Sequence, residues 1–86
     1  MKEMEKTEVG KVFNYFAKIG VAAINLTGDL KAGNRIYMES SEPFEQTVES
    51  MQIEHETVRE AKAGDGIGMK MAKPCHKGNR IYKIVE

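Results

Sequence analysis

Closely spaced turn signals constrain this chain more than any other feature of its sequence. Glycine, proline and asparagine recur so often that the stretches between them leave no room for a long helix. The clearest signal is Gly64-Asp65, which ends one segment and is followed directly by a new apolar run. Short apolar runs between glycine-containing turns are typical of small all-β domains, so we expect a barrel or a sandwich.

The apolar runs predict six strands. Imperfect alternation at Val12-Phe13 predicts a bulge or a twisted strand, and a second bulge is expected at Glu49 and Ser50. Residues 57–63 are expected to form one helical turn or an irregular link, because they are too few for a stable helix. The strands are expected at residues 8–18, 21–27, 34–39, 44–56, 66–72 and 79–85.

We therefore expect one domain over residues 8–86, a closed antiparallel β-barrel of about six strands. An 86-residue chain buries only about 60–65% of the surface that its unfolded form exposes, which suffices for one small core. Closure would also remove edge strands and their unpaired backbone groups. Residues 1–7 are polar without periodicity and are expected to form a flexible tail.

One five-residue phrase occurs twice. Gly33-Asn34-Arg35-Ile36-Tyr37 recurs as Gly78-Asn79-Arg80-Ile81-Tyr82. Glycine takes the left-handed conformation that many turns need, and asparagine tolerates it next best, so each copy predicts a turn that leads into a strand. The flanks of the two copies do not match, which favours two similar turns over a duplication. The residues assigned structural roles in turns are Gly33, Gly64, Asp65, Gly68 and Gly78.

Composition limits the classes of function. The 13 basic residues are balanced by 13 acidic ones, so the chain lacks the large positive field that non-specific nucleic-acid binding requires. Cys75 is the single cysteine and has no partner for an internal disulfide. The first residues are mostly charged, and no stretch approaches the ~20 apolar residues of a membrane span. We expect a cytoplasmic protein.

No residue pattern predicts catalysis, a metal site or a cofactor. Cys75 and His76 are adjacent, and adjacent residues of an extended chain point to opposite faces, so we interpret them as part of a connector. With His55 they are the obvious zinc ligands, which is fewer than the four that a structural site requires. Residues 64–68 lack the spacing and the following helix of a phosphate-binding loop. We predict a chain that is not an enzyme.

Charge is distributed unevenly along the chain. Residues 39–60 are dominated by glutamate, whereas residues 66–85 carry five basic residues and no acidic one. The two segments either pair across the sheet or leave a basic face, with Tyr82 and Tyr37 as a stacking surface, that meets RNA or an acidic partner. The candidate binding face consists of Lys70, Lys73, Lys77, Arg80, Tyr82 and Lys83.

Several segments of the chain occur in the order found in a known family. They are residues 9–12, 19–24, 30–36, 47–52, 61–68 and 77–81, of which Ala61 to Gly68 is the most specific. From Glu8 onward the chain resembles the second domain of translational GTPases, the β-barrel of elongation factor Tu and its relatives. Those proteins carry a phosphate-binding loop in a separate domain, and this sequence has none, so no GTP binding or hydrolysis is expected.

The resemblance leads to two functional hypotheses. The first is a non-enzymatic binding module that contacts tRNA, the ribosome or a translation-linked protein. Similar barrels also occur as accessory domains of collagenase-like peptidases. The alternative is therefore a protein–protein accessory domain that acts in trans with a separately encoded collagenase-like peptidase or RNA-modification enzyme. A small enzyme that uses Cys75 and His76 is a third hypothesis.

Overall fold

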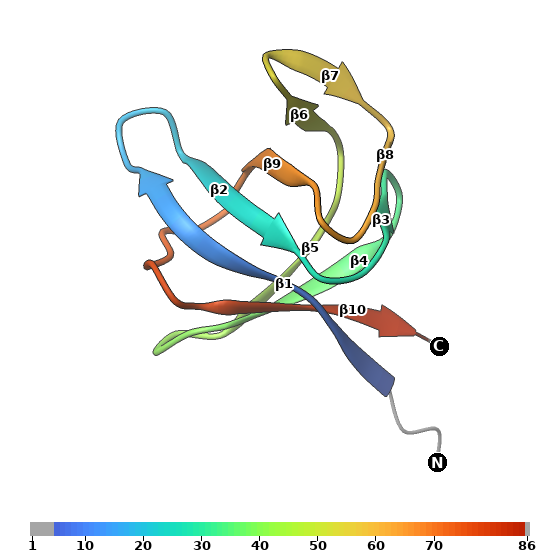
Figure 1. The fold of residues 1–86 in the computed structure, drawn as a ribbon. Helices are drawn as coiled ribbons and strands as arrows, with labels where there is room; N and C mark the ends of the chain where they lie inside the picture. The colour runs from blue at the N-terminus through green and yellow to red at the C-terminus, as the bar shows by residue number, and fades with distance from the viewer. Residues whose placement is uncertain (1–4, 86) are drawn as a thin grey trace.

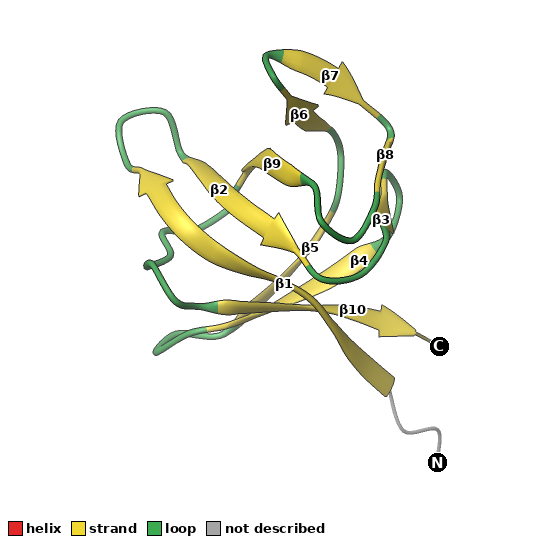
Figure 2. Cartoon of the chain, viewed as in Figure 1, coloured by secondary structure: helices red, strands yellow, loops and turns green. Residues whose placement is uncertain are grey.

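Ten β-strands and no helix make up residues 5–85, the part of the chain that the computed structural model describes (Figures 1 and 2). The all-β prediction is confirmed. The strands are β1 (Glu5–Phe16), β2 (Val21–Leu26), β3 (Leu30–Lys31), β4 (Arg35–Glu39), β5 (Phe44–Thr47), β6 (Met51–Ile53), β7 (Glu56–Val58), β8 (Glu60–Ala61), β9 (Gly66–Lys70) and β10 (Arg80–Val85). The predicted tail, residues 1–7, overlaps β1 from Glu5 onward, and residues 1–4 lie outside the described part. The described residues contain no helix long and apolar enough to cross a membrane.

Eight of the strands form one antiparallel sheet that curls into a half-barrel (Figure 1). Their order is β5-β4-β10-β1-β2-β9-β6-β7, and β3 pairs with β8 in a second, two-stranded sheet. The predicted closed barrel of about six strands is wrong, because the edge strands β5 and β7 do not pair with each other. β1 and β10 are neighbours in the middle of the sheet, so the two described ends of the chain lie side by side.

A side chain takes the place of strand pairing on the open side of the half-barrel. The amide nitrogen of Gln46 on β5 donates to the carbonyl of Lys70 at 3.0 Å, and the amide oxygen accepts from the N–H of Ala72 at 2.7 Å. These two bonds tie the edge strand β5 to the end of β9 without a backbone ladder. They satisfy backbone groups that closure would otherwise have paired.

The chain between residues 44 and 61 departs most from the sequence prediction. The strand expected over 44–56 is interrupted at residues 48–50, where a bulge was expected, and the link expected over 57–63 contains β7 and β8. Glu54 and His55 join β6 to β7 in a two-residue turn, with φ angles of 49° and 68°. Two consecutive left-handed residues are typical of a type I′ hairpin turn, which favours Asn and Gly. Glu-His carries no such signal, so the sequence does not predict this hairpin.

β1 is the strand with two register shifts. One lies next to Gly10, against β10, and the other lies between Val12 and Asn14, against β2, which confirms the bulge predicted at Val12-Phe13. A Cβ added at Gly10 would lie 2.8 Å from Cγ2 of Ile24, closer than atoms can pack, so this position requires glycine. The second shift leaves the consecutive residues Phe13 and Asn14 both exposed.

The turn at residues 31–34 is fixed by four hydrogen bonds. The side-chain oxygen of Asn34 accepts from the N–H of Lys31 at 3.0 Å, and the N–H of Asn34 donates to the Lys31 carbonyl at 3.1 Å. Gly33 has a φ of 96° and donates to the carbonyl of buried Val48, whose N–H donates back to the Asn34 carbonyl, both at 2.8 Å. The turn is thus attached to one residue of the core.

Two further turns repeat this arrangement. Asp65 and Asn79 accept from the backbone N–H three residues earlier, at 2.8 and 2.7 Å. Gly64 and Gly78 have φ angles of 97° and 95° and donate to the carbonyls of buried Leu26 and Val12. Both copies of the repeated phrase are therefore turns that lead into a strand, as predicted. The turn at residues 62–65 is a third of the same kind.

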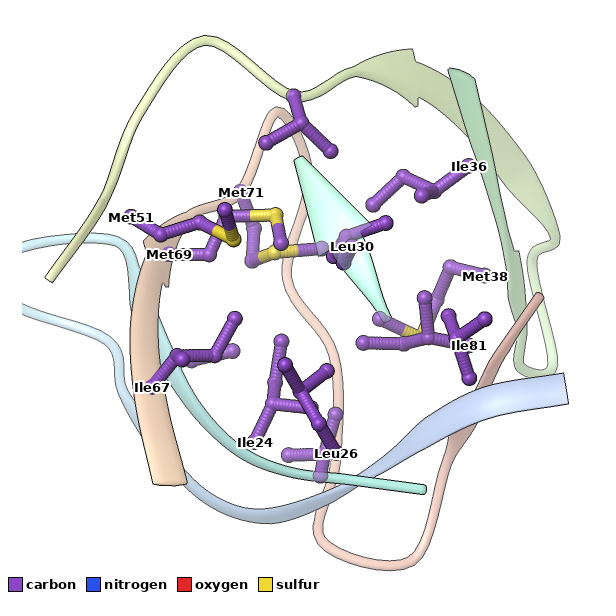
Figure 3. Packing of buried hydrophobic residues seen from close by; sticks show 14 of the residues in the cluster. Ile24, Leu26, Leu30, Ile36, Met38, Met51, Ile67, Met69, Met71 and Ile81 are labelled. Atoms are coloured by element: carbon purple, nitrogen blue, oxygen red, sulfur yellow. The ribbon is translucent and has the colours of Figure 1, made fainter. Parts of the chain in front are cut away.

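The inner side of the half-barrel holds a continuous apolar core. In Figure 3, Met51, Met69 and Met71 lie together on one side of Leu30, and Met38 lies on the other. Methionine is flexible enough to fill an irregular interior. No polar or charged side chain is buried among the described residues. Any functional site formed by these residues must therefore lie on the surface.

Candidate functional site

The outer side of β4, β10 and the first half of β1 is a surface on which charged side chains have partners. We call it the paired face. Arg80 Nη1 lies 3.6 Å from Glu8 Oε1, and Arg35 Nε lies 3.2 Å from Glu45 Oε1. The Tyr82 hydroxyl donates to Glu39 Oε2 at 3.2 Å. The paired face consists of Lys6, Glu8, Arg35, Tyr37, Glu39, Glu45, Arg80 and Tyr82.

The two tyrosines predicted as a stacking surface contact each other on this face. Their ring centroids are 6.3 Å apart with planes tilted by 56°, and Lys6 Nζ lies 4.1 Å from the Tyr37 ring centroid. Desolvation by neighbouring groups, and then the hydrogen bond to the Glu39 carboxylate, raise the pKa of Tyr82, while Arg80 acts in the opposite direction. The paired face is thus a network whose groups already have partners within the chain.

The six residues of the predicted binding face do not lie together. Arg80 and Tyr82 belong to the paired face. Lys83, on the same strand, is half-buried, and its Nζ lies 3.4 Å from the carbonyl of Asp29. Lys70 ends β9, and Lys73 and Lys77 follow it in the connector to β10; all three are exposed. The binding role of these residues stays a prediction, and the fold does not gather them on one surface.

The five residues assigned to turns also divide. Gly33, Gly64, Asp65 and Gly78 lie in the three turns described above. Gly68 instead lies within β9, opposite Ala23 on β2, so its assignment to a turn is wrong. Its surroundings are those of a strand residue, because an added Cβ would meet Val21 Cγ1 at an ordinary 3.5 Å.

Cys75 and His76 do not form a catalytic pair. Cys75 is 1% exposed and packs in the core, whereas His76 is exposed. Burial raises the pKa of the Cys75 thiol, which disfavours the thiolate that nucleophilic attack requires. Within residues 5–85, no group of three or more His, Cys, Asp or Glu side chains is placed to hold a metal ion.

A second surface was not anticipated from the sequence. The large hydrophobic side chains exposed among the described residues are Phe13, Phe16 and Ile19, at 44%, 47% and 61%, and all belong to the β1–β2 hairpin. Figure 1 shows that the turn of this hairpin stands clear of the rest of the ribbon. Lys11 and Lys18 lie on the same hairpin, and Lys70 lies opposite Val21 on the paired strand β9; neither the hairpin, residues 9–28, nor β9 contains an acidic residue. We call this surface the acid-free face; it consists of Lys11, Phe13, Phe16, Lys18, Ile19 and Lys70.

A signal for this face was present in the sequence. Residues 66–85 contain no acidic residue, and the same is true of residues 9–28, which include the hairpin. The aromatic and β-branched residues of the second run predict strands, and by themselves they do not indicate a surface. Strand order supplies the missing step, since β2 and β9 pair and bring the two runs together.

The comparisons with known proteins point to peptidases. No protein-family model matches the chain. It is 39% identical over 83 residues, or 94% of its length, to an uncharacterized protease of Methanocaldococcus jannaschii. It is 29% identical over 83 residues, or 93% of its length, to a collagenase of Porphyromonas gingivalis. The chain spans only 20% and 23% of the lengths of these two relatives.

The fold has a close counterpart among solved structures. It is the C-terminal domain of a Geobacillus thermoleovorans protein assigned to the U32 peptidases, with a TM-score of 0.83 and 20% identity over 96% of this chain and 97% of that one. At this identity the likeness concerns the fold. Together with the two sequence relatives it overturns the resemblance to translation-factor domain 2. The expectation of an elongation-factor-like domain is therefore wrong, and tRNA or the ribosome as a partner has no support from the comparisons.

Proposed function

We propose that this chain is a non-catalytic accessory domain that binds a collagenase-like peptidase. The observation that carries the proposal is the similarity of nearly the whole chain to one fifth of a protease and to less than a quarter of a collagenase. A segment of this size that recurs within longer peptidases is a module. This is the alternative that the sequence analysis kept open, and it is favoured over a translation module.

The described residues support a binding role over a catalytic one. The core is apolar throughout, Cys75 is buried, and the paired face uses its charged groups on one another. None of these features supplies a nucleophile with a base beside it, which covalent peptidase chemistry requires. A binding module requires only a stable scaffold and an exposed surface, and the structure has both.

Affinity purification tests the proposal. Tagged chain is incubated with lysate of its own source organism, with and without RNase, and the retained proteins are identified by mass spectrometry. We expect a collagenase-like peptidase to be enriched equally in both samples, and the purified pair to form a complex of defined stoichiometry in size-exclusion chromatography with light scattering. Enrichment of ribosomal proteins that disappears with RNase, or the absence of any peptidase, would contradict it.

A further inference from the structure

The strand order gathers the parts of the chain that lack acidic residues. Residues 9–28 and 66–85 hold seven of the 13 basic residues and none of the 13 acidic ones. The first run forms most of β1 and all of β2, and the second forms β9 and β10. These four strands are consecutive in the sheet, in the order β10-β1-β2-β9. A chain with no net charge therefore has a cationic middle and acidic flanks.

The strand register places apolar and cationic side chains in one row. Phe16 lies opposite Val21, and Val21 lies opposite Lys70, across β1, β2 and β9. In the next row Ala23 lies opposite Gly68, and both are half-buried. Because alanine has only a methyl group and glycine no side chain, few atoms of these two residues project from the sheet. Residues directly opposite one another are about 5 Å apart, which lets one bound segment contact both kinds of side chain.

The β1 bulge adds a further apolar side chain and a depression. The register shift turns Phe13 outward beside Asn14 instead of leaving one of the two inside. Next to Phe13 lies a surface depression of about 290 Å³ that is also lined by Lys11 and Lys77. A depression lined by two lysines and a phenylalanine suits a bound side chain that ends in a carboxylate.

The lysines of this region are available to a partner. Lys11, Lys18, Lys70 and Lys77 are exposed, and none forms an ion pair with any side chain that the structure describes. Glu49 lines a surface depression together with Lys70, but no ion pair joins the two. The four ammonium groups are therefore available to a bound segment of opposite charge.

We propose that the acid-free face binds a segment of a partner protein that carries both carboxylates and apolar side chains. Charge complementarity identifies the acidic component, and Phe13, Phe16 and Ile19 identify the apolar one. A second copy docked face to face would bring lysines against lysines, which disfavours a dimer. Phe13 and Phe16 are rings of the kind on which bases stack, but Ile19 and Val21 add aliphatic surface that stacking does not use. The chain as a whole also has no net charge to hold a phosphate backbone, so a protein fits better than a nucleic acid. The inference goes beyond the proposed function, because it does not require the partner to be a peptidase.

Fluorescence anisotropy with labelled peptides tests this assignment. The probes are a short peptide of glutamate and leucine, one of glutamate and serine, one of lysine and leucine, and an oligouridylate of equal length. We expect the Glu-Leu peptide to bind at least about tenfold more tightly than the other three. Its affinity should fall as salt rises from about 0.05 M to 0.5 M, because the lysine contribution is screened.

Matched variants locate the site. Phe16→Ser with Ile19→Ser, and separately Lys11→Gln with Lys70→Gln, should each weaken binding of the Glu-Leu peptide about tenfold or more. Lys31→Gln with Lys62→Gln makes the same change in net charge on exposed residues outside this face and should leave the affinity unchanged. Circular dichroism and thermal unfolding establish that each variant is folded.

Three results would overturn the inference. They are equal binding of all probes, unchanged binding by the variants of the acid-free face, and tighter binding of the oligouridylate. A dimer in size-exclusion chromatography that Phe16→Ser with Ile19→Ser dissociates would assign the face to a second copy instead. If the peptide binds but no peptidase is captured from lysate, the proposed function fails and this inference stands.

Discussion

The paired face and the acid-free face belong to one curled sheet and share strand β1. They differ in whether their charged side chains have partners within the chain. On the paired face, Arg35 contacts Glu45, Arg80 contacts Glu8 and Tyr82 contacts Glu39. On the acid-free face, the lysines occur with exposed phenylalanines and an isoleucine and form no ion pair with any carboxylate that the structure describes. The charged groups of the paired face have partners within the chain, whereas the lysines of the acid-free face are available to the partner segment that we propose.

The difference shows why total charge and residue type are poor guides to a binding surface. Exposed basic residues occur on both faces, but the ion pair with Glu8 reduces the field that Arg80 presents to solvent. Lys11 on β1 and Lys70 on β9 form no such ion pair. An exposed basic residue therefore indicates a binding site only where neighbouring strands bring it no acid.

The largest effect is expected at Gly10, where β1 passes from one face to the other. Gly10 lies opposite Ile81 on β10 and Leu26 on β2, and an added Cβ would lie 2.8 Å from Ile24 Cγ2 and 3.1 Å from the Asn25 carbonyl oxygen. Gly10→Ala should lower the free energy of unfolding by about 1–3 kcal/mol, because a rigid core must shift to accept the methyl group. Urea unfolding followed by circular dichroism measures the change.

Gly66→Ala is the matched control for this substitution. Gly66 also lies in a strand, but its added Cβ would meet only Asn25 Oδ1, at 3.7 Å. The control should leave stability within about 0.5 kcal/mol of the parent or raise it slightly. Equal stability of the two variants would show that the join between the faces tolerates a side chain, contrary to the packing described.

A smaller effect should separate the charges of the two faces. Arg35→Gln removes one partner of an exposed ion pair and should lower the free energy of unfolding by about 0.2–1 kcal/mol. Lys70→Gln removes a charge with no such partner and should change it by no more than about 0.5 kcal/mol, with stabilisation as the expected sign. Urea unfolding at low and high salt measures both. A loss for Lys70→Gln as large as that for Arg35→Gln would mean that Lys70 has an internal partner after all.

Sequence reasoning succeeded where local chemistry decides the structure. The glycines at residues 33, 64 and 78 take φ angles near 95°, which a side chain rarely adopts, and each is followed by an Asn or Asp that accepts a backbone hydrogen bond. Such turns are visible in the sequence because their residue types are nearly obligatory. The strands that follow them, β4, β9 and β10, were predicted within a few residues.

Sequence reasoning failed where contacts between residues far apart in the chain determine the structure. The β6–β7 turn has Glu54 and His55 at positive φ, which such residues seldom adopt, where β6 pairs with β7 along its length and with β9 at Met51 and Gln52. On the open side of the half-barrel, the side chain of Gln46 bonds to the backbone at the end of β9, which no local pattern indicates. The predicted binding face was read as one run of sequence, whereas alternation and the connector assign its residues to different sides of the sheet.

The smallest expected effect is a shift in one pKa, and it tests whether the paired face acts as a network. Desolvation and the Glu39 carboxylate raise the folded-state pKa of Tyr82 above its unfolded value near 10, so the folded state favours the neutral phenol. The resulting stabilisation is present below pH ~10 and is lost as the pH rises through the folded-state pKa. Glu39→Gln should lower the pKa of Tyr82 only in part, because desolvation remains, and ultraviolet titration of tyrosinate measures the change. Comparison of the parent with Tyr82→Phe identifies the part of the titration signal that belongs to Tyr82. If Glu39→Gln leaves that signal unmoved, the hydrogen bond contributes nothing to the pKa, and the paired face is a set of independent residues and not a network.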